Sequence, residues 1–210
     1  MRQDLTDITI VLDRSGSMTS VREDTIGGYN SFIAAQCGLP GRATISLVQF
    51  DNEYETVYSG VDCLMVKRME QRHFQPRGST ALCDAIGRTI NFTGERLSAL
   101  REAQRPGKVV IVTLTDGIEN ASKKFKREQV AAMVKHQREV YGWEFVFLGA
   151  NQDAVLTGES LGVPKESSLT YAHDANGVST VMDSASCYVG NLRSVGKASF
   201  GAADRERQER

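Results

Sequence analysis

The sequence predicts an α/β fold built on one doubly wound, mostly parallel sheet. Apolar, β-branched segments alternate with amphipathic helical segments along the 210 residues, and no Pro/Gly/Ser-rich linker, internal repeat or low-complexity tract interrupts them. Two of the most apolar segments each run directly into an aspartate, Asp13 and Asp116. We therefore expect a single Rossmann-like domain over residues 1–200, followed by a charged, disordered tail at 201–210.

The first strand and the first helix have clear patterns. Residues 6–12 form a nearly unbroken apolar run, which is typical of a parallel strand buried on both faces. Ile26, Tyr29 and Ile33 then recur at i, i+3 and i+7. This spacing predicts an amphipathic helix over residues 22–36.

The next two strands are predicted to form a hairpin. Residues 43–50 and 53–60 both have strand composition, and the link Asp51-Asn52 between them is typical of a tight turn. The third strand would then run antiparallel to the second. Its mixture of Tyr, Thr, Val and Glu suits the edge of a sheet. Residues 61–79, which follow, are polar and irregular.

The rest of the chain continues the alternation. A helix that begins at Ala81 precedes the most apolar strand, 108–115. The remaining predicted elements are a helix at 127–141, a strand at 143–149, a short helical piece at 152–161, a weak strand at 167–172 and a final helix whose apolar positions run from 178 to 192. We expect these six strands to adopt the order 3-2-1-4-5-6, with an antiparallel edge strand and helices on both faces.

Composition argues against several classes of function. The formal net charge of −1 gives no general attraction to nucleic acid or to an anionic membrane. No apolar run approaches the roughly 20 residues that cross a bilayer. The cysteines include no Cys-x-x-Cys pair, which favours free thiols in a cytoplasmic protein over a disulfide framework or a zinc site. The four cysteines are Cys37, Cys63, Cys83 and Cys187.

Oxygen ligands gather where the apolar strands end. Asp13 ends the first strand, and Ser15 and Ser17 follow it on a glycine-bearing loop. Asp116 follows the fourth strand, which neighbours the first where the strand order reverses and where such sheets bind ligands. Thr80 adds a hydroxyl ahead of a helix N-terminus. Two facing carboxylates repel one another unless a cation lies between them. The all-oxygen set predicts Mg²⁺ or Mn²⁺, with Ca²⁺ less favoured, and argues against zinc or copper.

These five residues resemble the metal-ion-dependent adhesion site of von Willebrand factor A domains. The matching segments, in order, are Asp13-x-Ser15-x-Ser17, Thr80 and Asp116-Gly117. The likeness covers about residues 5–195, and residues 12–18 look more like bacterial and phage members than animal adhesion receptors. The resemblance implies that the three hydroxyls ligate the metal and that the two aspartates act largely through water. An Asp or Glu carboxylate from a protein partner would fill the open metal position.

Three functions remain open at this point. The first is a non-enzymatic, divalent-metal-dependent module that binds protein, with neither nucleic acid nor membrane as a partner. The second is a metal-dependent hydrolase or phosphotransferase that uses the same carboxylates, although the chain has no P-loop, Gly-x-Ser-x-Gly elbow or Asp-x-Asp pair. In the third, the metal only staples loops and the working surface lies elsewhere, for example in residues 61–79. Taken alone, Asp13 and the serine loop are better explained as turn residues, Thr80 as a helix cap and Asp116-Gly117 as a turn, but these interpretations leave the joint pattern unexplained, which favours metal binding.

Several residues near the site have two interpretations. Asp84 either reaches the crevice or favours the dipole of its helix. Glu119 and Asn120 either shape the rim or belong only to a loop. A basic cluster on the same loop favours an acidic partner, or is simply solvated; it consists of Lys123, Lys124, Lys126 and Arg127. The histidines His73, His136 and His173 are interpreted as ordinary surface or packing residues.

Overall fold

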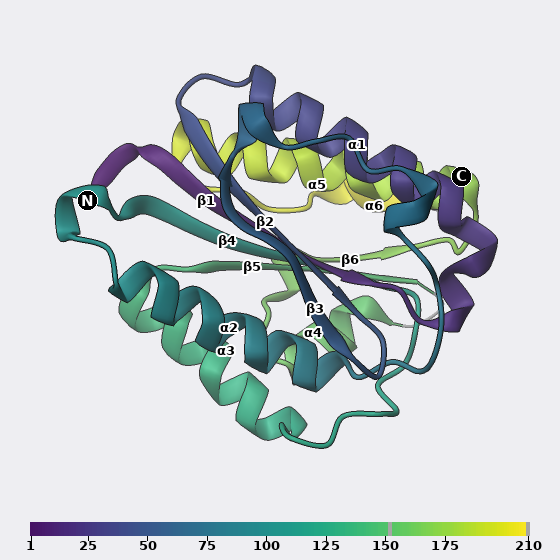
Figure 1. The fold of residues 1–210 in the computed structure, drawn as a ribbon. Helices are drawn as coiled ribbons and strands as arrows, with labels where there is room; N and C mark the ends of the chain where they lie inside the picture. The colour runs from purple at the N-terminus through teal and green to yellow at the C-terminus, as the bar shows by residue number, and fades with distance from the viewer. Residues whose placement is uncertain (151–152, 209–210) are drawn as a thin grey trace.

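A computed structural model describes residues 1–150 and 153–208 and contains a six-stranded sheet with helices on both faces (Figure 1). The strand order is β3-β2-β1-β4-β5-β6, and only β2 and β3 pair in antiparallel fashion. This confirms the predicted topology. The strands are β1 (Arg2–Asp13), β2 (Arg42–Phe50), β3 (Tyr54–Asp62), β4 (Pro106–Thr115), β5 (Glu144–Ala150) and β6 (Ser168–Tyr171). The α-helices are α1 (Arg22–Gly38), α2 (Leu82–Ser98), α3 (Arg127–Tyr141), α4 (Ala154–Ser160), α5 (Ala175–Val195) and α6 (Ala202–Gln208).

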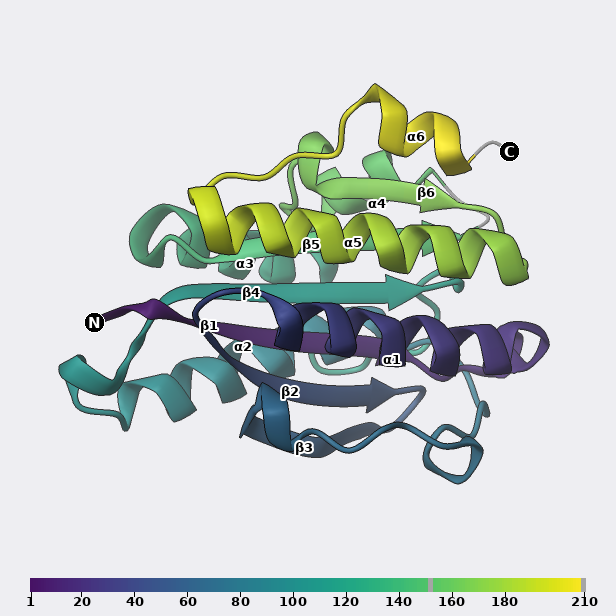
Figure 2. The same cartoon turned by 90° about the horizontal axis from the view of Figure 1, so that it is seen from above.

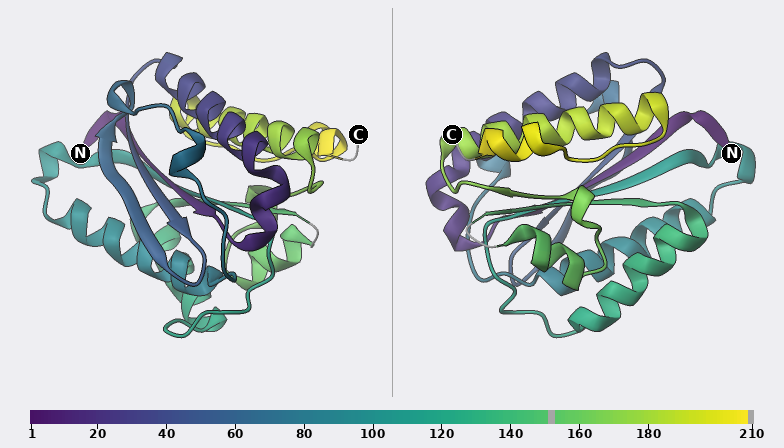
Figure 3. Two further views of the ribbon diagram at one scale, coloured as in Figure 1. Left: turned by 45° about the vertical axis from the view of Figure 1, so that its right-hand side comes forward. Right: turned by 180° about the vertical axis from the view of Figure 1, so that it is seen from behind.

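Two apolar cores lie on opposite faces of the sheet. Helices α1 and α5 lie side by side over one face (Figure 2), where Ile10 and Leu12 of β1 are buried. Helices α2 and α3 cover the other face (Figure 3), where Val11 joins Ile111 of β4. Because successive side chains of a strand point to opposite faces, β1 contributes to both cores. This is why its sequence is apolar at nearly every position.

Strands β1 and β4 deliver their last residues to the same edge of the sheet. Leu12 pairs with Leu114 in the parallel register, and Asp13 pairs with Phe50 of β2. Asp116 follows one residue after the end of β4. Asp13 and Asp116 are therefore neighbours in space. Asp13 also contacts the hydroxyl of Thr115, which lies 102 positions away in the sequence.

The structure differs from the sequence predictions mainly at the ends of elements. Strand β1 begins at Arg2 instead of residue 6, because Arg2 already pairs with Pro106 across a register shift. The final predicted helix begins earlier, at Ala175, because the Asp174 carboxylate accepts a hydrogen bond from the amide of Gly177 at 2.8 Å and caps it. The helical piece predicted at 152–161 is α4, with residue 152 outside the described residues.

The tail is ordered over most of its length. Residues 202–208, predicted to be disordered, form α6, which lies against α5 and β6. Phe200 is 5% exposed and packs on Tyr188 of α5, so the chain is anchored just ahead of this helix. Residues 209 and 210 lie outside the described part of the chain. None of the described helices combines the length and the apolar character needed to cross a membrane.

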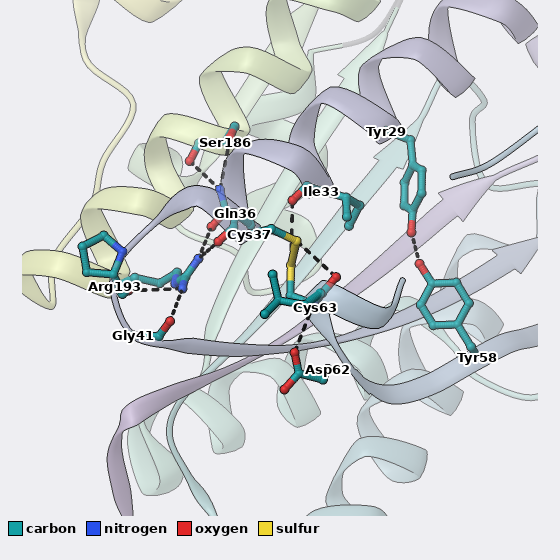
Figure 4. Close-up of a disulfide and its surroundings, with 12 residues drawn as sticks. Tyr29, Ile33, Gln36, Cys37, Gly41, Tyr58, Asp62, Cys63, Ser186 and Arg193 are labelled. Carbon is teal, nitrogen blue, oxygen red and sulfur yellow. Dashed lines mark hydrogen bonds between the residues drawn. A yellow bond between two sulfur atoms is a disulfide. The ribbon is translucent and has the colours of Figure 1, made fainter. Parts of the chain in front are cut away.

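The prediction of free thiols is wrong for Cys37 and Cys63, which form a disulfide (Figure 4). Cys37 lies in the last turn of α1, and Cys63 opens the short 3-10 helix Cys63–Met65 just after β3. The two residues are 26 positions apart and meet because the fold packs α1 against the short 3-10 helix that follows β3. Cys83 is buried and Cys187 is exposed, and both are free. The cytoplasmic location stays a prediction.

Candidate metal site

Asp13 is fixed from both sides at the end of β1. Its Oδ1 accepts a hydrogen bond from the amide of Ser15 at 2.7 Å, and its Oδ2 accepts one from the hydroxyl of Thr115 at 2.5 Å. The first bond makes an Asx turn, which folds the following loop back beside the carboxylate. Asp13 is fully buried, and these two hydrogen bonds hold its carboxylate in place. The hydroxyls of the loop therefore lie beside a fixed carboxylate.

Three oxygen atoms lie in a row beside Asp13. The hydroxyl oxygens of Ser15 and Ser17 are 3.1 Å apart, and the Ser17 hydroxyl donates to Oδ1 of Asp116 at 2.7 Å. Adjacent ligands of an octahedral Mg²⁺, with bonds of about 2.0–2.1 Å, lie about 2.9 Å apart. The spacing of these oxygens therefore fits the ligands of such an ion. Ser17 is exposed, so the row opens to solvent.

Thr80 reaches the same place from another loop. It is 3% exposed and lies two residues before α2, where its amide donates to Oδ1 of Asn120 at 3.0 Å and its carbonyl accepts from the amide of Asn120 at 3.1 Å. A Cβ atom added to Gly117 would lie only 2.3 Å from the Thr80 hydroxyl oxygen. Thr80 thus lies directly against the residue that follows Asp116. The structure brings the five predicted residues together at one edge of the sheet.

The site buries negative charge that its own residues do not fully compensate. Burial, and to a smaller extent the neighbouring Asp116 carboxylate, raise the pKa of Asp13 to about 6, although hydrogen bonds from Thr115 and Ser15 oppose the rise. The side chain of Asp116 is itself 1% exposed. A cation between the carboxylates would relieve both the desolvation cost and the repulsion. The charge and the donor oxygens therefore both fit a hard divalent ion.

A buried ion-pair network supports the loop that carries the serines, and the sequence analysis missed it. Arg14 is 6% exposed, and its Nε donates to Oδ2 of Asp51 at 3.0 Å. Arg77 donates to the same oxygen at 2.9 Å, and the Asp51 carbonyl accepts from the amide of Ala81 at 3.0 Å. Burial alone would raise the pKa of Asp51. Hydrogen bonds from Arg77, the Glu53 amide and Arg14 nevertheless hold this pKa below its ordinary value. The network joins the loops that carry Ser15 and Thr80.

The structure gives Asp84 a role that neither of its two interpretations named, and it shows Glu119 as a residue that holds its own loop. The Asp84 carboxylate accepts hydrogen bonds from three successive amides of the basic cluster's loop, at 3.0, 2.8 and 2.8 Å. Glu119 accepts from the amide of Cys83 at 2.7 Å and from the amide and hydroxyl of Ser122. Asn120, as described above, holds Thr80. These residues fix the loop that follows Asp116 on the start of α2.

His173 lies at the site, and its interpretation as an ordinary surface or packing residue is wrong. It follows β6 by two residues, and its Nε2 is 2.8 Å from Oδ2 of Asp116. The carboxyl ends of parallel strands meet at one edge of the sheet. A polar residue just after the sixth strand therefore indicates, from sequence alone, a side chain near the site.

The surface around the site combines apolar and basic groups. Ile118, two residues after Asp116, is 67% exposed. The three lysines of the basic cluster are exposed, whereas Arg127 donates to the hydroxyl of Ser160 at 2.7 Å. The loop that follows Asp116 therefore exposes one large apolar side chain and three cationic ones.

Sequence comparison finds no matching family model and no matching curated protein. Structure comparison finds several similar solved structures. The pilus adhesin SpaC from Lactobacillus rhamnosus GG superposes with a TM-score of 0.66 at 14% identity, over 89% of this chain and 30% of that chain. Proximal thread matrix protein 1 from the mussel byssus, with a zinc-occupied MIDAS motif, gives 0.60 at 15% identity, over 88% and 46%. A von Willebrand factor type A structure from Catenulispora acidiphila gives 0.58 at 13% identity, over 89% and 43%.

These likenesses establish the fold of the chain, which is the von Willebrand factor A fold. The chain spans less than half the length of each of these three structures. The bacterial or phage subtype stays a prediction.

Proposed function

We propose that this chain is a non-enzymatic, divalent-metal-dependent protein-binding module. The residues that would hold the ion are Asp13, Ser15, Ser17, Thr80 and Asp116. The observation that carries the proposal is the row of oxygens from Ser15, Ser17 and Asp116, whose separations of 3.1 and 2.7 Å suit neighbouring ligands of one cation. Mg²⁺ or Mn²⁺ is the ion expected from this all-oxygen set, with Ca²⁺ less favoured.

The binding step follows from the chemistry of the ligand set. The five residues fill at most five of the six positions of an octahedral ion, so the ion would accept one additional oxygen ligand. An Asp or Glu carboxylate of a protein partner supplies one. Ile118 and the exposed lysines of the basic cluster lie on the loop that follows Asp116 and favour an acidic partner. Neither nucleic acid nor membrane is the expected partner, and the cytoplasm is the proposed location.

The solved structures of this fold agree with a binding role. One of them is a pilus adhesin and another is a matrix protein of the mussel byssus with zinc at its MIDAS motif. The two alternatives make different predictions. A hydrolase or phosphotransferase would turn over a phosphoester or peptide with activity that depends on Asp13. A metal that only staples loops would leave partner binding to another surface, such as the 300 Å³ apolar pocket between β3 and the segment that contains Met65 and Met69.

The test is a peptide array that carries random sequences around a central Asp, with matched arrays that carry Asn instead. We expect the chain to bind Asp peptides in Mg²⁺, and to lose them in EDTA, on the Asn array and in the variants Thr80→Ala and Ser17→Ala. Ser20→Ala is the matched control, because Ser20 is an exposed serine on the same 3-10 helix, Gly16–Val21. Binding that is indifferent to EDTA and to Thr80→Ala would refute the proposal and favour the stapling alternative.

A further inference from the structure

The apolar pocket beside β3 is a hollow of about 300 Å³ between this strand and residues 63–73. Tyr29 of α1 and Tyr58 of β3 line it, and their side chains point toward one another and are hydrogen-bonded through the hydroxyl groups (Figure 4). Ligand pockets in proteins usually have volumes of about 300–1,000 Å³. This pocket is at the lower end of that range, so it suits a side chain of a partner better than a large cofactor.

A β-bulge turns two successive side chains of β3 into this pocket. Thr56 and Tyr58 pair with adjacent residues of β2, so Val57 between them is an extra residue. Successive side chains of a regular strand point to opposite faces, whereas Val57 and Tyr58 both line the pocket. The bulge therefore enlarges the apolar wall. Bulges also disfavour the addition of another strand at a sheet edge, so a partner is recognised here by its side chains.

The outer wall of the pocket, residues 63–69, is attached to α1 at both ends. Cys63 is joined to Cys37 by the disulfide. At the other end, Asn30 exchanges hydrogen bonds with the backbone of Met69 at 2.8 and 3.0 Å. These attachments hold the wall in place without a ligand. Binding at the pocket would therefore cost little ordering of the chain.

The wall between these attachments exposes apolar and cationic side chains. Leu64 and Met65 are 78% and 73% exposed, and Met65 lines the pocket. Lys67 and Arg68 also line the pocket and are exposed. Among the residues that the structure describes, neither of these two cationic side chains has an ion-pair or hydrogen-bond partner. Exposed apolar groups beside a pocket are typical of an interaction site, and unpaired cations favour an acidic partner.

We propose that the pocket and its outer wall form a second docking surface, which binds an acidic protein segment that carries one large apolar side chain. That side chain enters the pocket, and the Asp or Glu residues that flank it pair with Lys67 and Arg68. A small apolar molecule in the pocket would leave Leu64 exposed, whereas a protein segment covers it. None of the five metal-site residues belongs to this surface, so binding here needs no metal.

The test is a phage-displayed library of random peptides that is panned on the full chain in EDTA, so that the metal site takes no part. We expect the enriched peptides to carry a large apolar residue flanked by Asp or Glu. Lys67→Glu/Arg68→Glu should weaken the binding of a synthetic enriched peptide at least about 10-fold, because repulsion replaces attraction. Lys197→Glu/Arg207→Glu is the matched control. It reverses one exposed lysine and one exposed arginine elsewhere and should change the affinity by less than about 3-fold.

Met65→Gln tests the apolar part of the surface. Glutamine keeps the length of the side chain but is polar, so the peptide affinity should fall about 10-fold. Leu156→Gln is the control, because Leu156 is an exposed apolar residue on α4. In the wild type labelled at its methionine methyl groups, the NMR signal that Met65→Gln lacks should shift when the peptide is added. All these substitutions are at exposed positions, and circular dichroism verifies that the variants are folded.

Three results would overturn the proposal. The first is that no peptide is enriched in EDTA, or that the enriched peptides carry no Asp or Glu. The second is that Lys67→Glu/Arg68→Glu and Met65→Gln bind the peptides as the wild type does. The third is self-association of the wild type that both variants abolish, because a second copy would then cover the surface. Loss of Asp peptides in EDTA or in Thr80→Ala reports on the metal site alone, so either proposal can fail without the other.

Discussion

Gly117 lies so close to Thr80 that a methyl group added to it would displace the Thr80 hydroxyl. A Cβ atom at position 117 would lie 2.3 Å from Oγ1 of Thr80 and 3.1 Å from its Cβ, so the whole threonine side chain must move. We expect Gly117→Ala to weaken Mg²⁺ binding about 10- to 100-fold, because the hydroxyl leaves its place, and to cost about 1–3 kcal/mol of unfolding free energy in EDTA. Calorimetry and urea unfolding measure the two effects.

Gly27→Ala is the control for this variant. Gly27 lies inside α1, and a Cβ atom there meets nothing within 4 Å. Alanine should stabilise the helix by about 0.5–1 kcal/mol and leave Mg²⁺ binding unchanged. A folded Gly117→Ala protein that binds Mg²⁺ as the wild type does would show that Thr80 has no part in the site.

The residues that supply the site's oxygen ligands could be recognised in the sequence, but the residues that hold their loops in place could not. Asp13, Ser15 and Ser17 are recognisable because they are contiguous and end a strand. Asp51 was recognised only as a turn residue, because its partner Arg14 lies 37 positions away and an ion pair between distant loops leaves no spacing pattern. His173 could have been found from its place after a parallel strand, but its distance from Asp116 depends on a loop whose course the sequence does not specify.

Besides the hydrogen bonds of Cys83 and Asp84, helix α2 makes one close packing contact with the loop after Asp116. A Cβ atom at Gly87 would lie 2.7–2.9 Å from ring atoms of Phe125, which belongs to that loop. We expect Gly87→Ala to lower the unfolding free energy by about 1–3 kcal/mol, because the ring must be displaced. Gly94→Ala on the same helix meets nothing within 4 Å and should instead stabilise by about 0.5–1 kcal/mol. Urea unfolding of both variants measures this, and equal effects would contradict the packing argument.

The disulfide stabilises the fold without holding the metal site. Closing a loop of 26 residues restricts the unfolded chain, so the double variant Cys37→Ser/Cys63→Ser should lose about 3.5 kcal/mol of unfolding free energy in the chain-entropy treatment. The segment that follows Cys63 remains attached to α1, since Asn30 exchanges hydrogen bonds with the backbone of Met69 at 2.8 and 3.0 Å. Mg²⁺ affinity should therefore stay within about 3-fold of the wild type.

Cys187→Ser provides the comparison for the disulfide variant. Cys187 is exposed and free, so its replacement should change neither stability nor metal binding. A loss of Mg²⁺ binding in the double variant, with the fold intact by circular dichroism, would mean that the disulfide does position the site.

At the scale of the whole molecule, hydrophobic patterning predicted the topology because the central strands β1, β4 and β5 are buried on both faces between helices. The alternation of apolar strands and amphipathic helices left few ways to arrange them, and the short β2–β3 turn marked the antiparallel edge. The disulfide and α6 escaped prediction for a shared reason. Both depend on contacts between segments distant in sequence: α1 with the end of β3, and the charged tail with α5 and β6. Local composition carries no information about such contacts.

The metal couples the site to the stability of the whole domain. If Mg²⁺ binds only the native state, a concentration 100 times its dissociation constant stabilises by about 2.7 kcal/mol. Asp13→Asn removes a buried carboxylate that, without metal, is poorly compensated beside Asp116. The variant should therefore melt at the same temperature as the wild type, or higher, in EDTA, and at a lower temperature in Mg²⁺. The exposed Asp183→Asn on α5 should follow the wild type in both conditions. Thermal unfolding measured with and without Mg²⁺ tests this prediction. If Mg²⁺ shifted the melting temperatures of Asp13→Asn and the wild type equally, no ion would occupy this edge of the sheet.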